Sequence, residues 1–99
     1  MALEPLRTTQ ARLEAAGFVG DLVAFEGLLH VAGSETYYEP SEVRVVETAR
    51  FEGSTDPDDE AILMAIATVD GTPIGLYVTP YGVDMSAEDA AVVQHLRDA

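Results

Sequence analysis

The spacing of apolar residues near the start of the chain predicts a helix. Leucines at positions 3, 6 and 13 recur at helical spacing, with alanines between them. Pro5 suits the first helical turn, because that turn leaves its N–H groups without partners, and Gly17 suits the C-terminal cap. We therefore expect a helix from about Pro5 to Ala16, which packs one narrow apolar face and leaves its arginines in solvent.

The residues after this helix favour extended structure. Apolar side chains dominate from Phe18 to Ala32, with Gly20 and Gly27 interrupting them. This pattern predicts one or two strands, of which the stretch near Leu28–Ala32 is the better one.

A turn and a second extended segment follow. Gly33-Ser34-Glu35 is typical of a turn, and residues 37–41 predict a polar connection that carries two tyrosines. Alternating valines from Val43 onward then predict a strand that runs to about Phe51.

The acidic segment 56–60 has the residues of a helix start. Asp56 suits the N-cap, and Asp59 completes a capping box. The apolar run after it fits a helix or a strand equally well by periodicity. Asp70-Gly71 decides between them, because it is the strongest short hairpin signal and a hairpin needs extended arms. We expect a single capped turn at 56–60 and a strand over Ile62–Val69.

A two-residue loop at Asp70-Gly71 would set the register of this hairpin. On one face it pairs Val69 with Thr72, Ala67 with Ile74, Ala65 with Leu76 and Leu63 with Val78. The other face carries Ile62, Met64, Ile66 and Tyr77. Both faces are apolar, so both need cover. We expect two short helices to cover one face and a second copy of the chain, in a homodimer, to cover the other.

The end of the chain predicts a second helix. A turn is expected at Tyr81–Asp84, and Ser86 with Asp89 forms a capping box. An apolar stripe follows and ends near Arg97. The order of helix, three or four strands and helix indicates one α+β domain over residues 1–99, with an antiparallel meander.

The charge is strongly acidic. The chain has 18 Asp and Glu, five arginines and no lysine, for a net charge of −13. Such a surface repels phosphates, so we expect no nucleic-acid partner and no anionic membrane partner. The acidic residues either bind a basic partner or adapt the protein to a cytoplasm with molar salt. They are spread along the chain, and about 1 M salt shortens the Debye length to roughly 3 Å, so we favour adaptation to salt, as in a halophile.

The sequence lacks the residues that several kinds of chemistry require. Without cysteine there is no disulfide and no thiolate metal site, and without lysine there is no G-x-x-x-x-G-K phosphate loop. No serine lies in a G-x-S-x-G elbow. No apolar run approaches the roughly 18 residues of a membrane span, and the start does not look like a signal peptide, so we expect a cytoplasmic protein. We therefore favour a function without catalysis.

The acidic segment is the best candidate for a metal site. Carboxylates at Asp56, Asp58, Asp59 and Glu60 are the ligands that Mg²⁺ and Ca²⁺ prefer. The calcium-loop pattern begins here and then fails, because Ala61 stands where the loop needs glycine. We favour the alternative that these acids form a cap, a turn and a salt-adapted surface, with no cofactor.

A second candidate site lies on the strand before this segment. Arg50 and Glu52 are two residues apart and so share a strand face. They predict either a structural ion pair, which we favour, or a ligand-binding edge to which Tyr81 contributes.

The segment Arg50–Leu63 also resembles a known family. It reads R-F-E-G, then D-P-D-D-E-A-I, and is followed by Asp70-Gly71 and Tyr81-Gly82. This pattern resembles a small family of uncharacterised bacterial proteins, whose members are often labelled phosphoribosylpyrophosphate synthetase. The resemblance covers Arg50 to Gly82 and implies an organisation with a helix first and a helix last. It implies no established activity, and a synthetase with two lobes needs more than 99 residues.

Three hypotheses about function follow. The first is a non-enzymatic, self-associating domain that binds a partner or a small ligand near residues 50–60. The second is a metal-dependent binder or enzyme for a phosphorylated sugar or nucleotide. In it, Asp56, Asp58 and Glu60 hold Mg²⁺ or Ca²⁺ and Arg50 meets a phosphate. The third is an acidic decoy for a basic partner.

Overall fold

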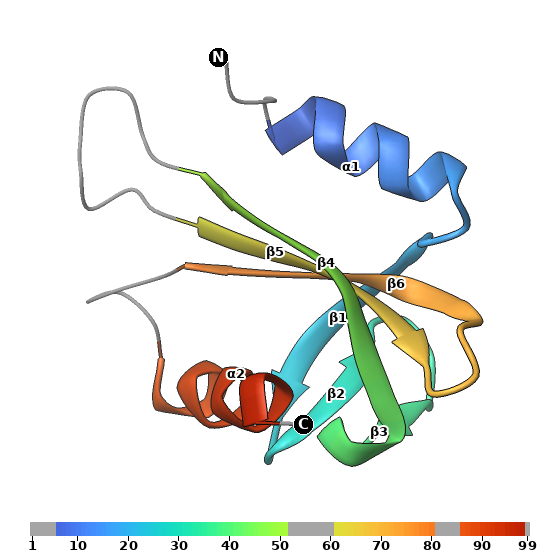
Figure 1. Cartoon of the computed structure of the whole chain (residues 1–99). Helices are drawn as coiled ribbons and strands as arrows, with labels where there is room; N and C mark the ends of the chain where they lie inside the picture. Colours follow the sequence, from blue (N-terminus) through green and yellow to red (C-terminus); the bar gives the residue numbers. More distant parts are fainter. Residues whose placement is uncertain (1–5, 52–60, 81–85, 99) are drawn as a thin grey trace.

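The computed structural model describes residues 6–51, 61–80 and 86–98, with a helix near each end of the chain. Helix α1 is Leu6–Ala15 and helix α2 is Ala87–Asp98, so both predicted helices are confirmed (Figure 1). The strands are β1 (Gly20–Phe25), β2 (Leu28–Val31), β3 (Tyr37–Tyr38), β4 (Val43–Phe51), β5 (Ala61–Thr68) and β6 (Pro73–Pro80), and a 3-10 turn, η1 (Pro40–Glu42), precedes β4.

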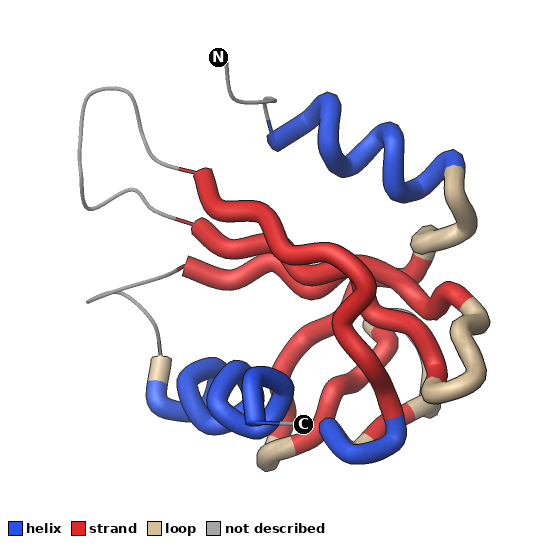
Figure 2. Tube along the Cα trace, in the orientation of Figure 1, coloured by secondary structure: helices blue, strands red, loops and turns tan. Residues whose placement is uncertain are grey.

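The six strands form one mixed sheet in the order β3-β2-β1-β6-β5-β4. In Figure 2 the strands, in red, lie between helices α1 and α2, in blue. Strands β1 to β3 make one antiparallel meander, and β4 to β6 make another. The two meanders join where β1 runs parallel to β6. The α+β class is therefore confirmed, whereas a single meander of three or four strands is wrong. Parallel pairing joins strands that are far apart in sequence, so no local sequence pattern predicts it.

The first meander contains two strands over residues 18–32, where one or two were predicted, and a tight turn at Gly27 joins them. Phe25 pairs with Leu28 across a loop of two residues, Glu26 and Gly27, with φ of 50° and 82°. Two positive φ values are the mark of the type I′ turn, whose twist matches that of the flanking strands. The tyrosines of the expected polar connection form the short strand β3, in which Tyr37 pairs with His30.

The β5–β6 hairpin keeps most of the predicted register through an irregularity. Its loop has three residues, because the N–H of Thr68 donates to the carbonyl of Thr72 at 2.9 Å. Ala67 therefore faces Pro73 and not Ile74. A register shift next to Ile66 then restores the predicted pairs Ala65–Leu76 and Leu63–Val78. A bulge has absorbed the extra loop residue.

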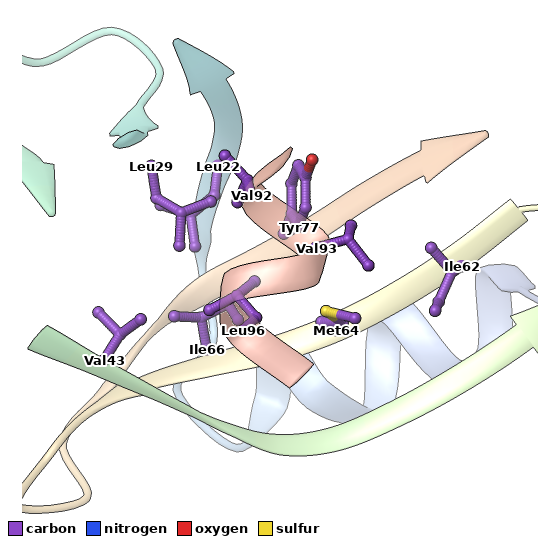
Figure 3. Packing of buried hydrophobic residues seen from close by; sticks show 10 residues of the cluster. All are labelled: Leu22, Leu29, Val43, Ile62, Met64, Ile66, Tyr77, Val92, Val93 and Leu96. Carbon is purple, nitrogen blue, oxygen red and sulfur yellow. The ribbon is translucent and has the colours of Figure 1, made fainter. Parts of the chain in front are cut away.

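The two helices lie on opposite sides of the sheet (Figure 1). Helix α2 covers the cluster Leu22, Leu29, Val43, Ile62, Met64, Ile66, Tyr77, Val92, Val93 and Leu96, shown in Figure 3. On the α1 side the cluster is Leu13, Phe18, Leu63, Ala65, Ala67 and Leu76. This explains why β5 is buried on both faces from Ile62 to Ala67.

This arrangement corrects the expected placement of the helices. They do not share one face, because each covers its own. The residues predicted as a self-association surface are Ile62, Met64, Ile66 and Tyr77, and they lie under α2 with exposed fractions of 5%, 2%, 0% and 1%. The chain covers that face with its own helix, because the apolar stripe of a helix and the apolar face of a sheet bury each other when they pack together. None of the helices in the part of the chain that the structure describes is long and apolar enough to span a membrane.

Candidate functional site

Most residues of the predicted metal and ligand sites lie outside the described residues. These are Glu52, Asp56, Asp58, Asp59, Glu60 and Tyr81. Arg50 is described. It is exposed near the end of β4, opposite Ile62 of β5. Within residues 6–51, 61–80 and 86–98, no group of three or more His, Asp or Glu is placed to hold a metal ion. The metal and ligand sites therefore stay predictions.

The described structure draws attention to a different surface, on the α1 side of strands β1 to β3. Val78 pairs with Leu63 of the α1-side core, which places it on that face. Asp21 lies opposite Leu76 in the parallel register, so Val23 and Phe25 follow on the same face. His30 pairs with Val23, and Tyr37 pairs with His30. We call the set Val23, Phe25, His30, Tyr37 and Val78 the open face.

Four side chains of the open face are exposed. The exposed fractions are 41% for Val23, 46% for Phe25, 45% for Tyr37 and 37% for Val78. In the α1-side core, by contrast, the side chains of β5 and β6 are buried. The described residues leave the four side chains of the open face more exposed than these. One half of the sheet face is thus packed, and the other half presents aromatic and apolar groups to solvent.

The aromatic rings of the open face are held in fixed relation to one another. His30 and Tyr37 stack with centroids 4.4 Å apart and planes 15° from parallel, and Phe25 lies 6.1 Å from Tyr37. The Nε2 atom of His30 is 2.8 Å from the carbonyl oxygen of Ser34. Because a carbonyl only accepts, Nε2 carries the proton and donates.

The loop before β3 is also fixed. The Ser34 hydroxyl donates to the carbonyl of Val31 at 2.7 Å and accepts from the N–H of Thr36 at 3.1 Å. These bonds hold the loop that delivers Tyr37 to the open face. A surface that is already ordered loses little conformational entropy when something binds to it.

The charged residues in the segment that carries most of the open face are all acidic. Between Arg12 and Arg44 the chain has no lysine and no arginine, and its acids there are Glu14, Asp21, Glu26, Glu35, Glu39 and Glu42. Asp21, on β1, and Glu26 and Glu35, in the adjoining loops, are exposed. We call these three residues the acidic rim.

Three of the arginines are placed toward the other end of the sheet. Arg44 and Arg50 are on β4, the strand farthest from β3 in the sheet order. Arg12 of α1 forms an ion pair with Glu47 of β4, at 2.6 Å. In three dimensions, Arg44 and Arg50 thus lie at one edge of the sheet, and the acidic rim lies on β1 and its adjoining loops toward the other.

A second polar cluster joins β6 to the start of α2. The Tyr77 hydroxyl donates a hydrogen bond to Oδ1 of Asp89 at 2.5 Å. Ser86 caps helix α2, because the Ser86 hydroxyl accepts a hydrogen bond from the N–H of Asp89 at 3.0 Å. The N–H of Glu26 donates to the Glu88 carboxylate at 2.6 Å, which ties the β1–β2 turn to the same helix end.

The surroundings of Tyr77 keep its hydroxyl protonated. Burial first, and then the hydrogen bond and charge of Asp89, raise the pKa of the Tyr77 hydroxyl far above its usual range. Tyr77 therefore keeps its proton at neutral pH and acts as a donor, whereas a catalytic base must release it near the working pH. One bond of the predicted capping box is confirmed, from the N–H of Asp89 to the Ser86 hydroxyl, and that hydroxyl also donates to the Asp89 carboxylate at 2.9 Å.

Sequence reasoning missed the open face because its residues come from separate strands. The one local signal is the run Leu22-Val23-Ala24-Phe25, in which both faces of a strand are apolar. Comparison with known proteins adds no further signal, since no family model, no curated protein and no solved structure matches the chain.

Proposed function

We propose that this domain is a non-enzymatic interaction module that binds another protein through the open face. The observation that carries the proposal is the concentration of exposed apolar groups. Of the seven large hydrophobic side chains exposed in the described residues, four belong to this one surface: Val23, Phe25, Tyr37 and Val78. Contiguous exposed apolar groups mark interaction sites, and aromatic residues are enriched in protein interfaces.

The shape and order of the surface support a macromolecular partner. The open face spans four neighbouring strands, β6, β1, β2 and β3, and so offers a broad area in place of a single contact. Its stacked rings and hydrogen-bonded loop are ordered before anything binds. The general acidity of the chain belongs to the proposal as an adaptation to high salt, which keeps such an exposed surface soluble.

Selection from a library of random 12-residue peptides tests this function. The wild-type protein is the bait, and the double variant Phe25→Ser with Tyr37→Ser is the counter-selection. Both side chains are exposed, so the double variant should keep its fold, which circular dichroism checks. Val69→Ser is the matched control, because Val69 is 63% exposed but lies in the β5–β6 loop.

We expect peptides that bind the wild type and Val69→Ser but not the double variant. Peptides that bind all three proteins equally, or no enriched peptides at all, would contradict the proposal. Analytical sedimentation of the same proteins tests whether a second copy of the chain binds the open face. A wild-type dimer that the double variant abolishes would assign the open face to a second copy of the chain in place of a different protein.

A further inference from the structure

Resting on this proposed function, we infer that the partner is a basic segment, with apolar side chains that contact the open face and arginines that meet its edge. The acidic rim is the first observation. Asp21, Glu26 and Glu35 adjoin the open face, and no lysine or arginine occurs between Arg12 and Arg44. Interfaces place complementary charges opposite one another, because like charges cost free energy when they meet.

The exposed tyrosine is the second observation. Tyr37 stacks on His30 and remains 45% exposed. The face of a tyrosine ring attracts a cation, and the planar guanidinium of arginine stacks on such rings better than the ammonium of lysine does. Aromatic groups inside a rim of carboxylates thus favour arginine over an uncharged polar residue.

Charge also separates this partner from a second copy of the chain. A two-fold interface brings the same patch of both subunits together, so the acidic rim would face itself. Each copy also carries a net charge of −13. Arg44 and Arg50 lie on β4, at the far edge of the sheet, and Arg12 is already paired with Glu47. A basic segment of another protein is therefore the occupant that the charges favour.

The composition of the selected peptides tests the inference. The selection is run at the lowest KCl concentration at which the chain stays folded. Counter-selection against the Phe25→Ser, Tyr37→Ser variant is essential here, because that variant has the same net charge and removes peptides held by charge alone. We expect the remaining peptides to combine aliphatic or aromatic residues with two or more arginines.

One selected peptide and its Arg→Gln counterpart then give the affinities by calorimetry. We expect the arginine peptide to bind the wild type at least tenfold more tightly than the glutamine peptide. Neutralising the rim with Asp21→Asn, Glu26→Gln and Glu35→Gln should remove most of this preference while the glutamine peptide binds as before. Tyr37→Leu, which keeps apolar bulk but removes the ring, should also reduce it.

The outcomes separate this inference from the proposed function. Neutral or acidic peptides that depend on Phe25 and Tyr37 would overturn the basic partner and leave the interaction module standing. An arginine preference that survives neutralisation of the acidic rim would also overturn it. A selection without peptides that depend on the open face would overturn both.

Discussion

The main chains of Gly20 and Gly75 touch at the point where the two meanders join. A Cβ atom on Gly75 would stand 2.2 Å from the carbonyl oxygen of Gly20, and one on Gly20 would stand 2.7 Å from the carbonyl oxygen of Ile74. These two residues are partners in the parallel β1–β6 register. The obstacle is backbone on both sides, so no side-chain rotation relieves it, and the junction requires glycine at position 75.

We therefore expect Gly75→Ala to lower the free energy of unfolding by about 3 kcal/mol or more, at the upper end of overpacking effects. Urea unfolding followed by circular dichroism measures it. Gly71→Ala is the control, because Gly71 has φ of +99° but open space around it. It should cost only about 1–2 kcal/mol for the unfavourable backbone conformation. Equal losses in the two variants would contradict the close approach.

The Tyr77–Asp89 hydrogen bond predicts a loss of stability in alkali. Burial raises the pKa of Tyr77 above its usual value, while in the unfolded chain the hydroxyl loses its proton near pH 10. The stability that this group contributes is therefore complete below pH 10. It falls above that pH, by up to about 1.4 kcal/mol per pH unit, because only the unfolded state releases the proton.

Unfolding in urea at pH 8 to 11 checks this dependence. The chain has no lysine, so few other groups titrate in this range. We expect Tyr77→Phe to flatten the fall and to cost about 1–2 kcal/mol at pH 8, because Asp89 loses a donor. Tyr37→Phe removes an exposed hydroxyl and should leave the fall in place. An unchanged slope in Tyr77→Phe would contradict the assignment.

The carboxylate of Asp70 predicts a weaker dependence in acid. The hydroxyl of Thr68, and then the N–H of Thr72, lower the pKa of Asp70, which is fully exposed. Its stabilising effect is thus present above the unfolded pKa of about 3.9 and is lost as the pH falls through the lower folded value. An NMR titration of the Asp70 side-chain carboxyl carbon measures the pKa directly. We expect Thr68→Val to raise it toward the usual value, and an unaffected titration would contradict the hydrogen bond.

The net charge of −13 predicts that salt stabilises the fold. Repulsion between like charges falls as the Debye length shortens from about 10 Å at 0.1 M to about 3 Å at 1 M. We expect the midpoint of thermal unfolding to rise by at least about 4–8 °C over this range, equivalent to roughly 1 kcal/mol. Scanning calorimetry in KCl gives the result, and a midpoint that is flat or falls would count against salt adaptation.

Added salt should have the opposite effect on the ion pair between Arg12 and Glu47, whose contribution to stability it lowers. Its side chains are 48% and 35% exposed, so the pair contributes at most about 1 kcal/mol, and salt weakens it. Replacing both residues with glutamine keeps the net charge and removes this term. We expect the double variant to be slightly less stable in 0.1 M KCl and to gain more from added salt than the wild type. A smaller gain would show that the pair is not attractive.

The sequence alone determined the local elements of this protein. Both helices, the long strand Val43–Phe51 and the arms of the β5–β6 hairpin follow from apolar spacing, caps and a single Asp-Gly turn. The two faces of that hairpin were also predicted, because side chains alternate between faces along a strand. Ile74 is the exception: it packs against the α2-side cluster, because the bulge breaks the alternation along β6. Such features depend on residues close together in the chain, whose conformations and hydrogen bonds the sequence constrains directly.

Tertiary structure decided the rest. The parallel contact at Gly20 and Gly75 joins segments far apart in sequence, and a close backbone approach has no local pattern beyond the glycines themselves. Which helix covers which face depends on where the sheet leaves room, and this placed Met64 and Tyr77 under α2. The open face likewise exists only because β1, β2, β3 and β6 lie side by side, since exposure depends on what packs nearby and not on the residue alone.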